Sequence, residues 1–127
     1  MNGCARASIM AGAMALLLGV LAGAFGAHAL AQRLTPAMLG VFRTAVDYQL
    51  VHGLGLILVG LLADRAASAR LLAWTAACMT AGIVLFSGSL YLLALGAPRN
   101  LGVLAPVGGT AFLVAWALVG LSAWRSR

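Results

Sequence analysis

The side chains in this sequence that could do chemistry are few, and several of them lie in the stretch Phe42–Gly55. This stretch contains Asp47, Tyr48, Gln49 and His52, so it holds one of the two acidic residues and one of the two histidines in the chain. It also leads directly into a long apolar run. Ionisable and hydrogen-bonding groups at membrane depth are expensive, so they mark either satisfied contacts between helices or a working site. We therefore take this stretch as the centre of the candidate site.

Polar side chains near the ends of the other apolar segments extend this stretch into a predicted cluster. The cluster consists of His28, Tyr48, Gln49, His52, Ser87, Ser89, Tyr91 and Thr110. If the apolar segments cross the membrane alternately, all of these residues fall in the same half of it. The sequence thus predicts a polar intramembrane cluster that is a candidate ligand or proton site.

The helical period of 3.6 residues sorts the polar side chains of the second apolar segment. Tyr48, Gln49 and His52 share one face of a helix, whereas Asp47 is expected to face elsewhere. Arg43 precedes Asp47 by four residues, so we expect these two charges to pair at the membrane interface, where an exposed pair contributes at most about 1 kcal/mol.

The two histidines allow three interpretations. The favoured one is structural, with each imidazole hydrogen-bonded to a neighbouring helix. Ligand binding or proton handling by His28 and His52 comes second. A metal comes last, because no thiolate or carboxylate lies at ligand spacing from either histidine. Ser87 and Tyr91, four residues apart, are likewise expected to form hydrogen bonds between helices.

The sequence lacks the catalytic motifs that would indicate an enzyme. The sequence contains no Gly-x-Ser-x-Gly, no His-Glu-x-x-His and no phosphate-binding loop. Cys4 and Cys78 lie far apart and suggest neither a disulfide nor a metal motif. We expect no catalytic residues, no metal and no cofactor.

The composition indicates which elements must position the cluster. Of the 127 residues, 64% are hydrophobic and 8% charged, with a mean hydropathy of +1.08, which is far from the composition of a soluble domain. A spanning helix needs about 20 apolar residues, and the charged residues leave room for four. We predict an all-α fold, an integral membrane antiparallel bundle of four transmembrane helices, as one domain over residues 1–127. The expected spans are 8–30, 46–63, 71–97 and 101–124.

Local signals mark where these helices begin and end. Thr35-Pro36 is a typical helix start, and a helix from there would have its first turns, 37–45, at the interface before crossing. Residues 64–70 predict a tight polar turn. Gly96 and Pro98 end the third span, and Pro106 predicts a kink or a late start in the fourth.

Small residues recur every four positions in the first span. They are Ala11, Ala15, Gly19, Gly23 and Ala27. Such stripes let helices approach closely in lipid, and packing within the chain is favoured over a homodimer face.

The first span also resembles a signal peptide, with Ala27-His28-Ala29 as a possible cleavage site. Its length and the three further spans favour its retention in the mature protein.

The charges concern orientation and partners. All eight cations are arginines, and the net charge is +6. They are spread between spans, so we expect lipid headgroups, and not nucleic acid, as the counter-charge. In a four-span topology Arg6, Arg65, Arg70, Arg125 and Arg127 oppose Arg33, Arg43 and Arg99. This bias predicts a multi-pass plasma-membrane protein, in a bacterium an inner-membrane one, with both termini in the cytoplasm.

Four segments of the sequence together resemble a known family. They are Gly23–His28, Thr44–His52, Leu85–Leu95 and Pro106–Trp116. In this order they are similar to the small YgdD-like inner-membrane proteins, a domain-of-unknown-function family with animal relatives. The resemblance implies a four-helix membrane protein and argues against signal cleavage at His28. It implies no activity, substrate or cofactor.

Two functions remain open from the sequence. The first is a binding, interaction or accessory membrane protein whose polar cluster lies near the non-cytoplasmic interface, with the lipid bilayer and a second copy or another membrane protein as partners. The alternative is a small oligomeric transporter or proton-coupled permease that uses His28 and His52.

Overall fold

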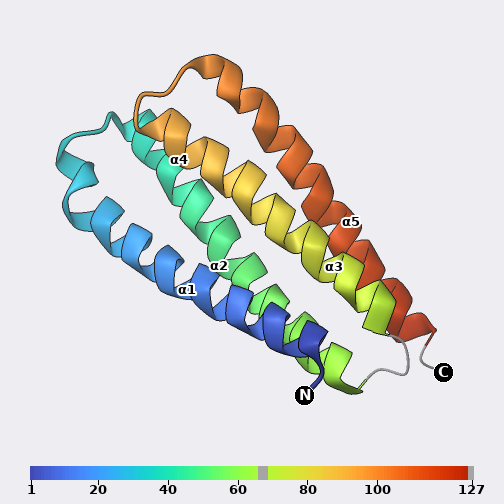
Figure 1. The fold of residues 1–127 in the computed structure, drawn as a ribbon. Helices are drawn as coiled ribbons and strands as arrows, with labels where there is room; N and C mark the ends of the chain where they lie inside the picture. The colour runs from blue at the N-terminus through green and yellow to red at the C-terminus, as the bar shows by residue number, and fades with distance from the viewer. Residues whose placement is uncertain (66–68, 126–127) are drawn as a thin grey trace.

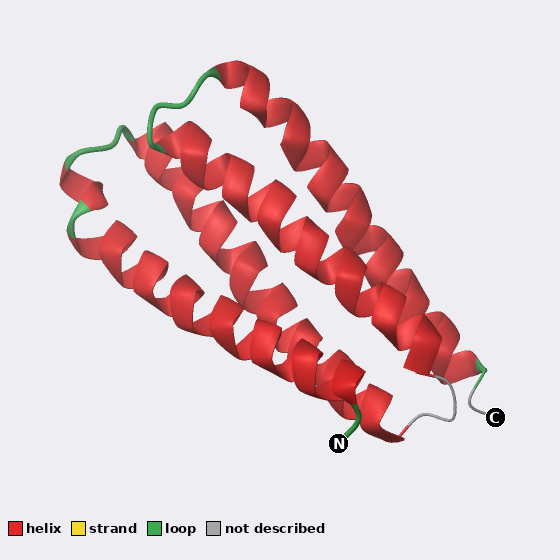
Figure 2. Cartoon of the chain, viewed as in Figure 1, coloured by secondary structure: helices red, strands yellow, loops and turns green. Residues whose placement is uncertain are grey.

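The computed structural model describes residues 1–65 and 69–125, and in these the chain is helical without a strand (Figure 2). Its elements are α1 (Gly3–His28), η1 (Leu30–Gln32), α2 (Pro36–Arg65), α3 (Ala69–Gly82), η2 (Ile83–Ser87), α4 (Gly88–Ala94), η3 (Arg99–Val103) and α5 (Leu104–Trp124). Within the described residues, four segments are long and apolar enough to span a membrane: Gly3–Gln32, Pro36–Arg65, Arg70–Ala94 and Arg99–Trp124. The predicted all-α fold of four antiparallel spans is confirmed.

The helices pack in a chain of neighbours. The α1 helix lies on α2, α2 lies on α3 and α4, and α3 lies on α5. Successive spans alternate in direction, so α1 begins and α5 ends at the same end of the bundle (Figure 1). The two outermost helices, α1 and α5, therefore expose broad apolar faces to lipid.

The helix ends follow the local signals. Thr35 Oγ1 accepts a hydrogen bond from the Met38 N–H at 3.2 Å, so α2 begins at Pro36 as predicted. The third span ends at Ala94, where Gly96 adopts a φ of 97° and the Ala97 N–H donates to the Leu92 carbonyl at 2.9 Å, a glycine cap typical of helix ends.

The fourth span starts late. Arg99–Val103 forms a 3-10 turn, so the α-helix begins only at Leu104. Pro106 thus lies in the first turn of α5, where a missing N–H costs little. Of the predicted turn between Asp64 and Arg70, residues 66–68 lie outside the described residues, as does Arg127.

The second span differs most from its predicted bounds. The predicted helix start is confirmed, since α2 is one continuous helix from Pro36 to Arg65, while the placement of residues 37–45 at the interface stays a prediction. Phe42 lies against Gly26 at one end, and Gly60 lies against Ile9 at the other. A helix of 30 residues is about 45 Å long and exceeds the hydrocarbon core of about 30 Å. Both ends of α2 therefore reach the interfaces.

Small residues hold α1 against α2. A Cβ on Gly12 would lie 2.6 Å from the Gly53 carbonyl oxygen, and one on Gly60 would lie 2.9 Å from the Ala5 carbonyl oxygen. The buried positions of α1 are Ala5, Ser8, Gly12, Ala15, Gly19 and Gly26. The two helices therefore approach until their backbones touch, as is typical of helix pairs in lipid.

The buried stripe of α1 corrects the predicted one. Ala15 and Gly19 are buried, Ala11 and Gly23 are half-buried, and Ala27 is exposed. Positions four apart drift around a helix by about 40° at each step, so a row that starts at Ala11 leaves the interface before Ala27. The contact continues at Gly26 instead.

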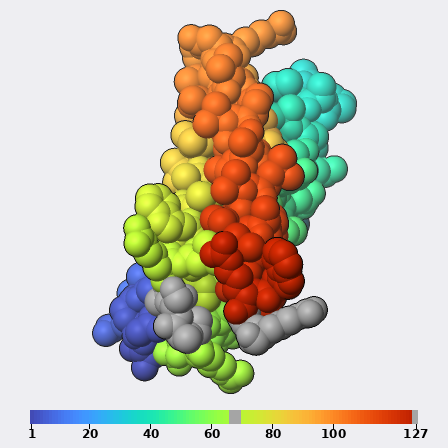
Figure 3. Space-filling model, turned by 90° about the vertical axis from the view of Figure 1, so that its right-hand side faces the viewer, coloured from blue at the N-terminus to red at the C-terminus, as the bar shows by residue number. Residues whose placement is uncertain are grey.

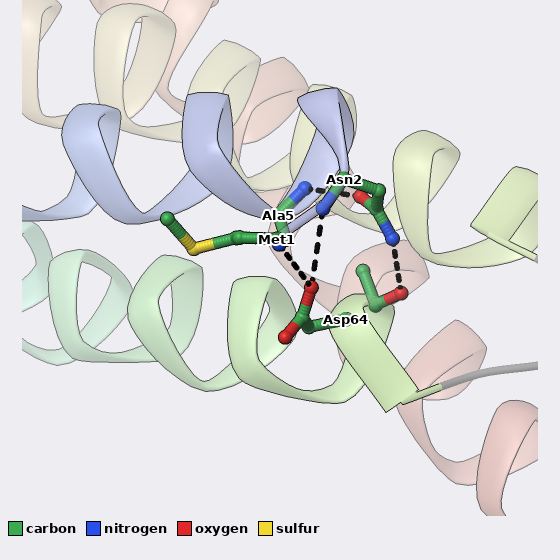
Figure 4. Close-up of polar contacts among 5 residues, drawn as sticks. Met1, Asn2, Ala5 and Asp64 are labelled. Atoms are coloured by element: carbon green, nitrogen blue, oxygen red, sulfur yellow. Dashed lines mark hydrogen bonds and ion pairs between the residues drawn. The ribbon is translucent and has the colours of Figure 1, made fainter.

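Asn2, which sequence reasoning missed, joins the two helices at their shared end. Its Oδ1 accepts from the Ala5 N–H at 2.8 Å, and its Nδ2 donates to the Ala63 carbonyl at 2.7 Å (Figure 4). Asp64 Oδ1 accepts from the Asn2 N–H at 3.1 Å and lies 3.7 Å from the Met1 ammonium. Asn2 is therefore both the cap of α1 and a bridge to α2.

The α1–α2 contact generates a first prediction. Gly12→Ala places a methyl group against the Gly53 carbonyl and should lower the free energy of unfolding by about 1–3 kcal/mol, although alanine is the better helix former. Thermal unfolding of the purified protein in detergent, followed by circular dichroism, measures this. Gly40→Ala is the control, because its Cβ meets no atom within 4 Å. Equal midpoints for the two variants would contradict the proposed close contact.

Candidate functional site

One part of the predicted polar cluster links helices. Gln49 Nε2 donates to the Ala15 carbonyl of α1 at 2.8 Å, and its Oε1 accepts from the Tyr91 hydroxyl of α4 at 2.7 Å. Ser87 Oγ donates to the Ala45 carbonyl of α2 at 2.8 Å. We call Gln49, Tyr91 and Ser87 the latch. All of its polar atoms have partners among protein atoms, so it holds α1, α2 and α4 in register.

The other part lines a groove between α2 and α5. The α5 helix packs on α3 and η2, and it reaches α2 through long side chains. Phe112 stacks on His52 with ring centroids 3.4 Å apart, and a Cβ on Gly55 would lie 3.4 Å from the Trp116 ring. These bulky side chains hold the two helices apart. In Figure 3, α5 (orange to red) runs down the front with the first half of α2 (teal) beside it.

The groove forms an open cavity of about 630 Å³. It is lined by Asp47, Tyr48, Val51 and His52 from α2, Phe86 from η2, and Pro106, Gly109, Thr110, Phe112, Leu113 and Trp116 from α5. Many of these side chains are exposed, Val51 by 54% and Leu113 by 73%. In a bilayer such a groove opens sideways to the lipid.

A π-helical turn, η2, builds one wall of this groove. The Gly88 N–H donates to the Ile83 carbonyl five residues back, so one extra residue is inserted and the helix phase shifts by about 100°. Gly108 makes room for this turn, because a Cβ there would clash with the Phe86 backbone nitrogen. As a result Phe86 lines the groove while Ser87 reaches α2.

His52, which lines the groove, has one ring nitrogen without a protein partner. Its Nδ1 lies 2.7 Å from the Tyr48 carbonyl oxygen, and a carbonyl can only accept, so Nδ1 carries a proton. Among the described residues no protein atom pairs with Nε2, and no buried side-chain nitrogen or oxygen lacks a partner. Nε2 is therefore not fully buried, although the His52 side chain as a whole is only 4% exposed, and His52 is among the residues that line the cavity.

Aromatic rings surround this histidine. Tyr48 lies 5.9 Å from His52, 4.5 Å from Phe86 and 6.1 Å from Phe112, between ring centroids. Trp116 lies 5.9 Å from His52. Four rings from three elements, Tyr48, Phe86, Phe112 and Trp116, thus form an apolar wall around the His52 imidazole.

Asp47 lies differently from its predicted place. It lines the same cavity as Tyr48 and His52, and in the described part of the chain no ion pair within 4.0 Å joins it to Arg43 or to another cation. Asp47 lines the cavity together with Tyr48 and His52 because the groove is wide. Positions 47, 48, 51 and 52 form two adjacent rows on α2, and the residues of both rows line the cavity.

His28 does not join His52. It is exposed at the end of α1, whereas Gly53, next to His52, packs against Ala15 and Leu16. Thirteen residues of α1 separate Ala15 from His28, or about 20 Å along the helix. The predicted shared depth is therefore corrected, because His52 is the seventeenth of the 30 residues of α2 and lies near the middle of the bundle, whereas His28 is the last residue of α1.

The two remaining cluster residues form local bonds. Ser89 Oγ donates to the Phe86 carbonyl at 2.9 Å and supports the π-helical turn. Thr110 Oγ1 donates to the Pro106 carbonyl at 2.9 Å, and its side chain lines the groove.

Sequence reasoning missed Phe86, Phe112 and Trp116 as parts of the site. One signal could have identified two of them: Gly109, Phe112 and Trp116 follow the three- and four-residue spacing of one helix face. Phe86 carried no such signal, since its direction depends on the inserted residue in η2.

Comparison with known proteins agrees with this architecture. The family model described as "Protein of unknown function (DUF423)" matches residues 22–109. The chain is 42% identical to the UPF0382 membrane protein YwdK of Bacillus subtilis over 91% of this chain and 94% of that protein. It is 38% identical to the UPF0382 inner membrane protein YgdD of Escherichia coli over 83% and 79%.

A third relative is similar over its length. The UPF0382 membrane protein SH2409 of Staphylococcus haemolyticus is 38% identical over 92% of this chain and 94% of that protein. No solved structure matches the chain significantly. With four apolar spans and relatives named as membrane proteins, the chain belongs to the DUF423 family of uncharacterised membrane proteins, as its resemblance to YgdD-like proteins implied.

Proposed function

We propose that this integral membrane protein is a binding protein whose groove between α2 and α5 takes up a small amphiphilic ligand from the lipid phase. The observation that carries the proposal is the 630 Å³ cavity, which is lined by His52, whose Nε2 has no partner among the described protein atoms. Ligand sites are concave and mostly apolar, with a few polar groups that fix orientation. The groove has this composition, with His52 and Thr110 among rings and aliphatic side chains.

The polar cluster has two roles in this proposal. The latch residues, Gln49, Tyr91 and Ser87, have their polar atoms occupied by protein partners, so they act in folding. His52 and Tyr48 act in binding. The proposal assigns no catalysis to either group.

A permease that relays protons between His28 and His52 is supported less well. The two imidazoles are about 20 Å apart along the bundle, and His28 is not among the residues that line the groove. A transport role would have to use His52 alone, in an assembly of several copies.

The proposal includes an orientation. Arg6, Arg65, Arg70 and Arg125 lie toward the end where α1 begins and α5 ends, and Arg33, Arg43 and Arg99 lie toward the other. The positive-inside rule then favours a cytoplasmic location for both termini. The groove, which begins near Pro106, would open toward the opposite leaflet.

A substitution that fills the groove tests the binding role. A Cβ on Gly109 would lie 3.7 Å from the Phe86 ring, in ordinary contact, so Gly109→Leu should fold and occupy the cavity. Native mass spectrometry of protein released gently from membranes should show a non-covalent small-molecule adduct on the wild type. Gly109→Leu should lack this adduct.

Gly120→Leu is the matched control, because it makes the same change on α5 where no atom lies within 4 Å. It should keep the adduct. A wild type that carries no adduct, or an adduct that is equally abundant on Gly109→Leu, would refute the binding role of the groove.

The separation of latch and groove can be tested at Tyr91. Tyr91→Phe removes the hydroxyl that donates to Gln49 and should lower the free energy of unfolding by about 1 kcal/mol. The adduct should persist, because Tyr91 does not line the groove. Unfolding in detergent and native mass spectrometry give the two readings. If Tyr91→Phe lost the adduct at unchanged stability, Tyr91 would act in binding and not in the latch.

A further inference from the structure

We propose that the ligand of the groove is an amphiphilic organic cation, held by the Asp47 carboxylate and by the faces of the surrounding aromatic rings. This inference rests on the proposed binding role and names the chemical class of its ligand. It draws on three features of the groove: an unpaired carboxylate, a set of rings and a depth below the headgroups.

The first feature is the charge of Asp47. The chain has two acidic residues. The other, Asp64, lies at the end of α2 beside the Met1 ammonium at 3.7 Å. Asp47 has no such partner among the described residues, and none of the residues that line the groove is an arginine. A carboxylate without a partner within a membrane span marks a functional site that a cation would complete.

The second feature is the ring wall. Tyr48, Phe86 and Trp116 all line the cavity together with Asp47. Aromatic faces attract cations through the ring quadrupole, and cages of such rings recognise quaternary ammonium groups. Trp116 and Tyr48 are 39% and 43% exposed, so parts of these rings are free to contact a ligand.

The third feature is depth, which favours a free cation over a lipid headgroup. Asp47 is the twelfth residue of α2, about 17 Å from its start at 1.5 Å per residue. If the helix, about 45 Å long, is centred on a hydrocarbon core of about 30 Å, Asp47 lies about 9 Å inside the hydrocarbon. An ammonium headgroup stays at the surface, whereas a cation with an apolar body can enter to this depth.

The test uses tetraphenylphosphonium, a cation with an apolar body, and tetraphenylborate, an anion of matched shape. Equilibrium dialysis of both radiolabelled ions against the purified full-length protein in uncharged detergent gives their affinities. The wild type should bind the phosphonium at least about tenfold more tightly than the borate. The net charge of +6 would by itself favour the borate, so this preference must arise locally.

Two substitutions of the same kind locate the interaction. Asp47→Asn should weaken phosphonium binding by about tenfold or more, while Asp64→Asn, which lies outside the groove, should leave it unchanged. Thermal unfolding of each variant verifies that it is folded.

The outcomes separate this inference from the binding role. Absence of phosphonium binding, or equal binding by the wild type and Asp47→Asn, overturns the cation assignment. If both ions bind equally and Gly109→Leu abolishes both, the groove is a binding site without charge selectivity. In that case the proposed function stands and this inference fails.

Discussion

The structure depends on how closely its helices can approach where no hydrophobic force drives them together. Lipid tails are as apolar as leucine, so helix pairs in a bilayer are held by van der Waals contact and hydrogen bonds. Gly12, Gly53 and Gly60 let α1 and α2 touch at the backbone, and Gly108 does the same for α5 against η2. These contacts fix the distances on which the rest of the bundle relies.

The groove follows from an unequal use of these contacts. Glycines bring α5 close to η2, but Phe112 and Trp116 stand between α5 and α2, so the bundle remains open on one side. The polar residues of α2 then divide by face. Gln49 points inward and is bonded at both ends, whereas Asp47 and His52 line the groove. Stability and recognition are thus assigned to neighbouring residues of one helix.

The sequence predicted the fold better than the site. Apolar segment lengths, Thr35-Pro36 and Gly96 were sufficient for four helices and two of their ends, because these signals act locally. The positions of Phe86 and Asp47 were not predictable in this way. Phe86 depends on a residue inserted in η2, and Asp47 depends on the width of a groove that only the packing of α5 defines. The depth of His52 was misjudged because α2 extends from Pro36 to Arg65, and this length places His52 near the middle of the helix.

The groove is tested most directly by measuring how accessible the open side of α2 is to small apolar molecules in the membrane. Nitroxide labels placed singly at positions 44–60, in protein reconstituted into lipid vesicles, report their collisions with dissolved oxygen. If the groove is open, oxygen accessibility should be high at Asp47 and Val51 and low at the buried positions Ala45, Leu56 and Val59. Low accessibility at both Asp47 and Val51 would mean that α5 closes on α2 in the membrane, and it would contradict the existence of the groove.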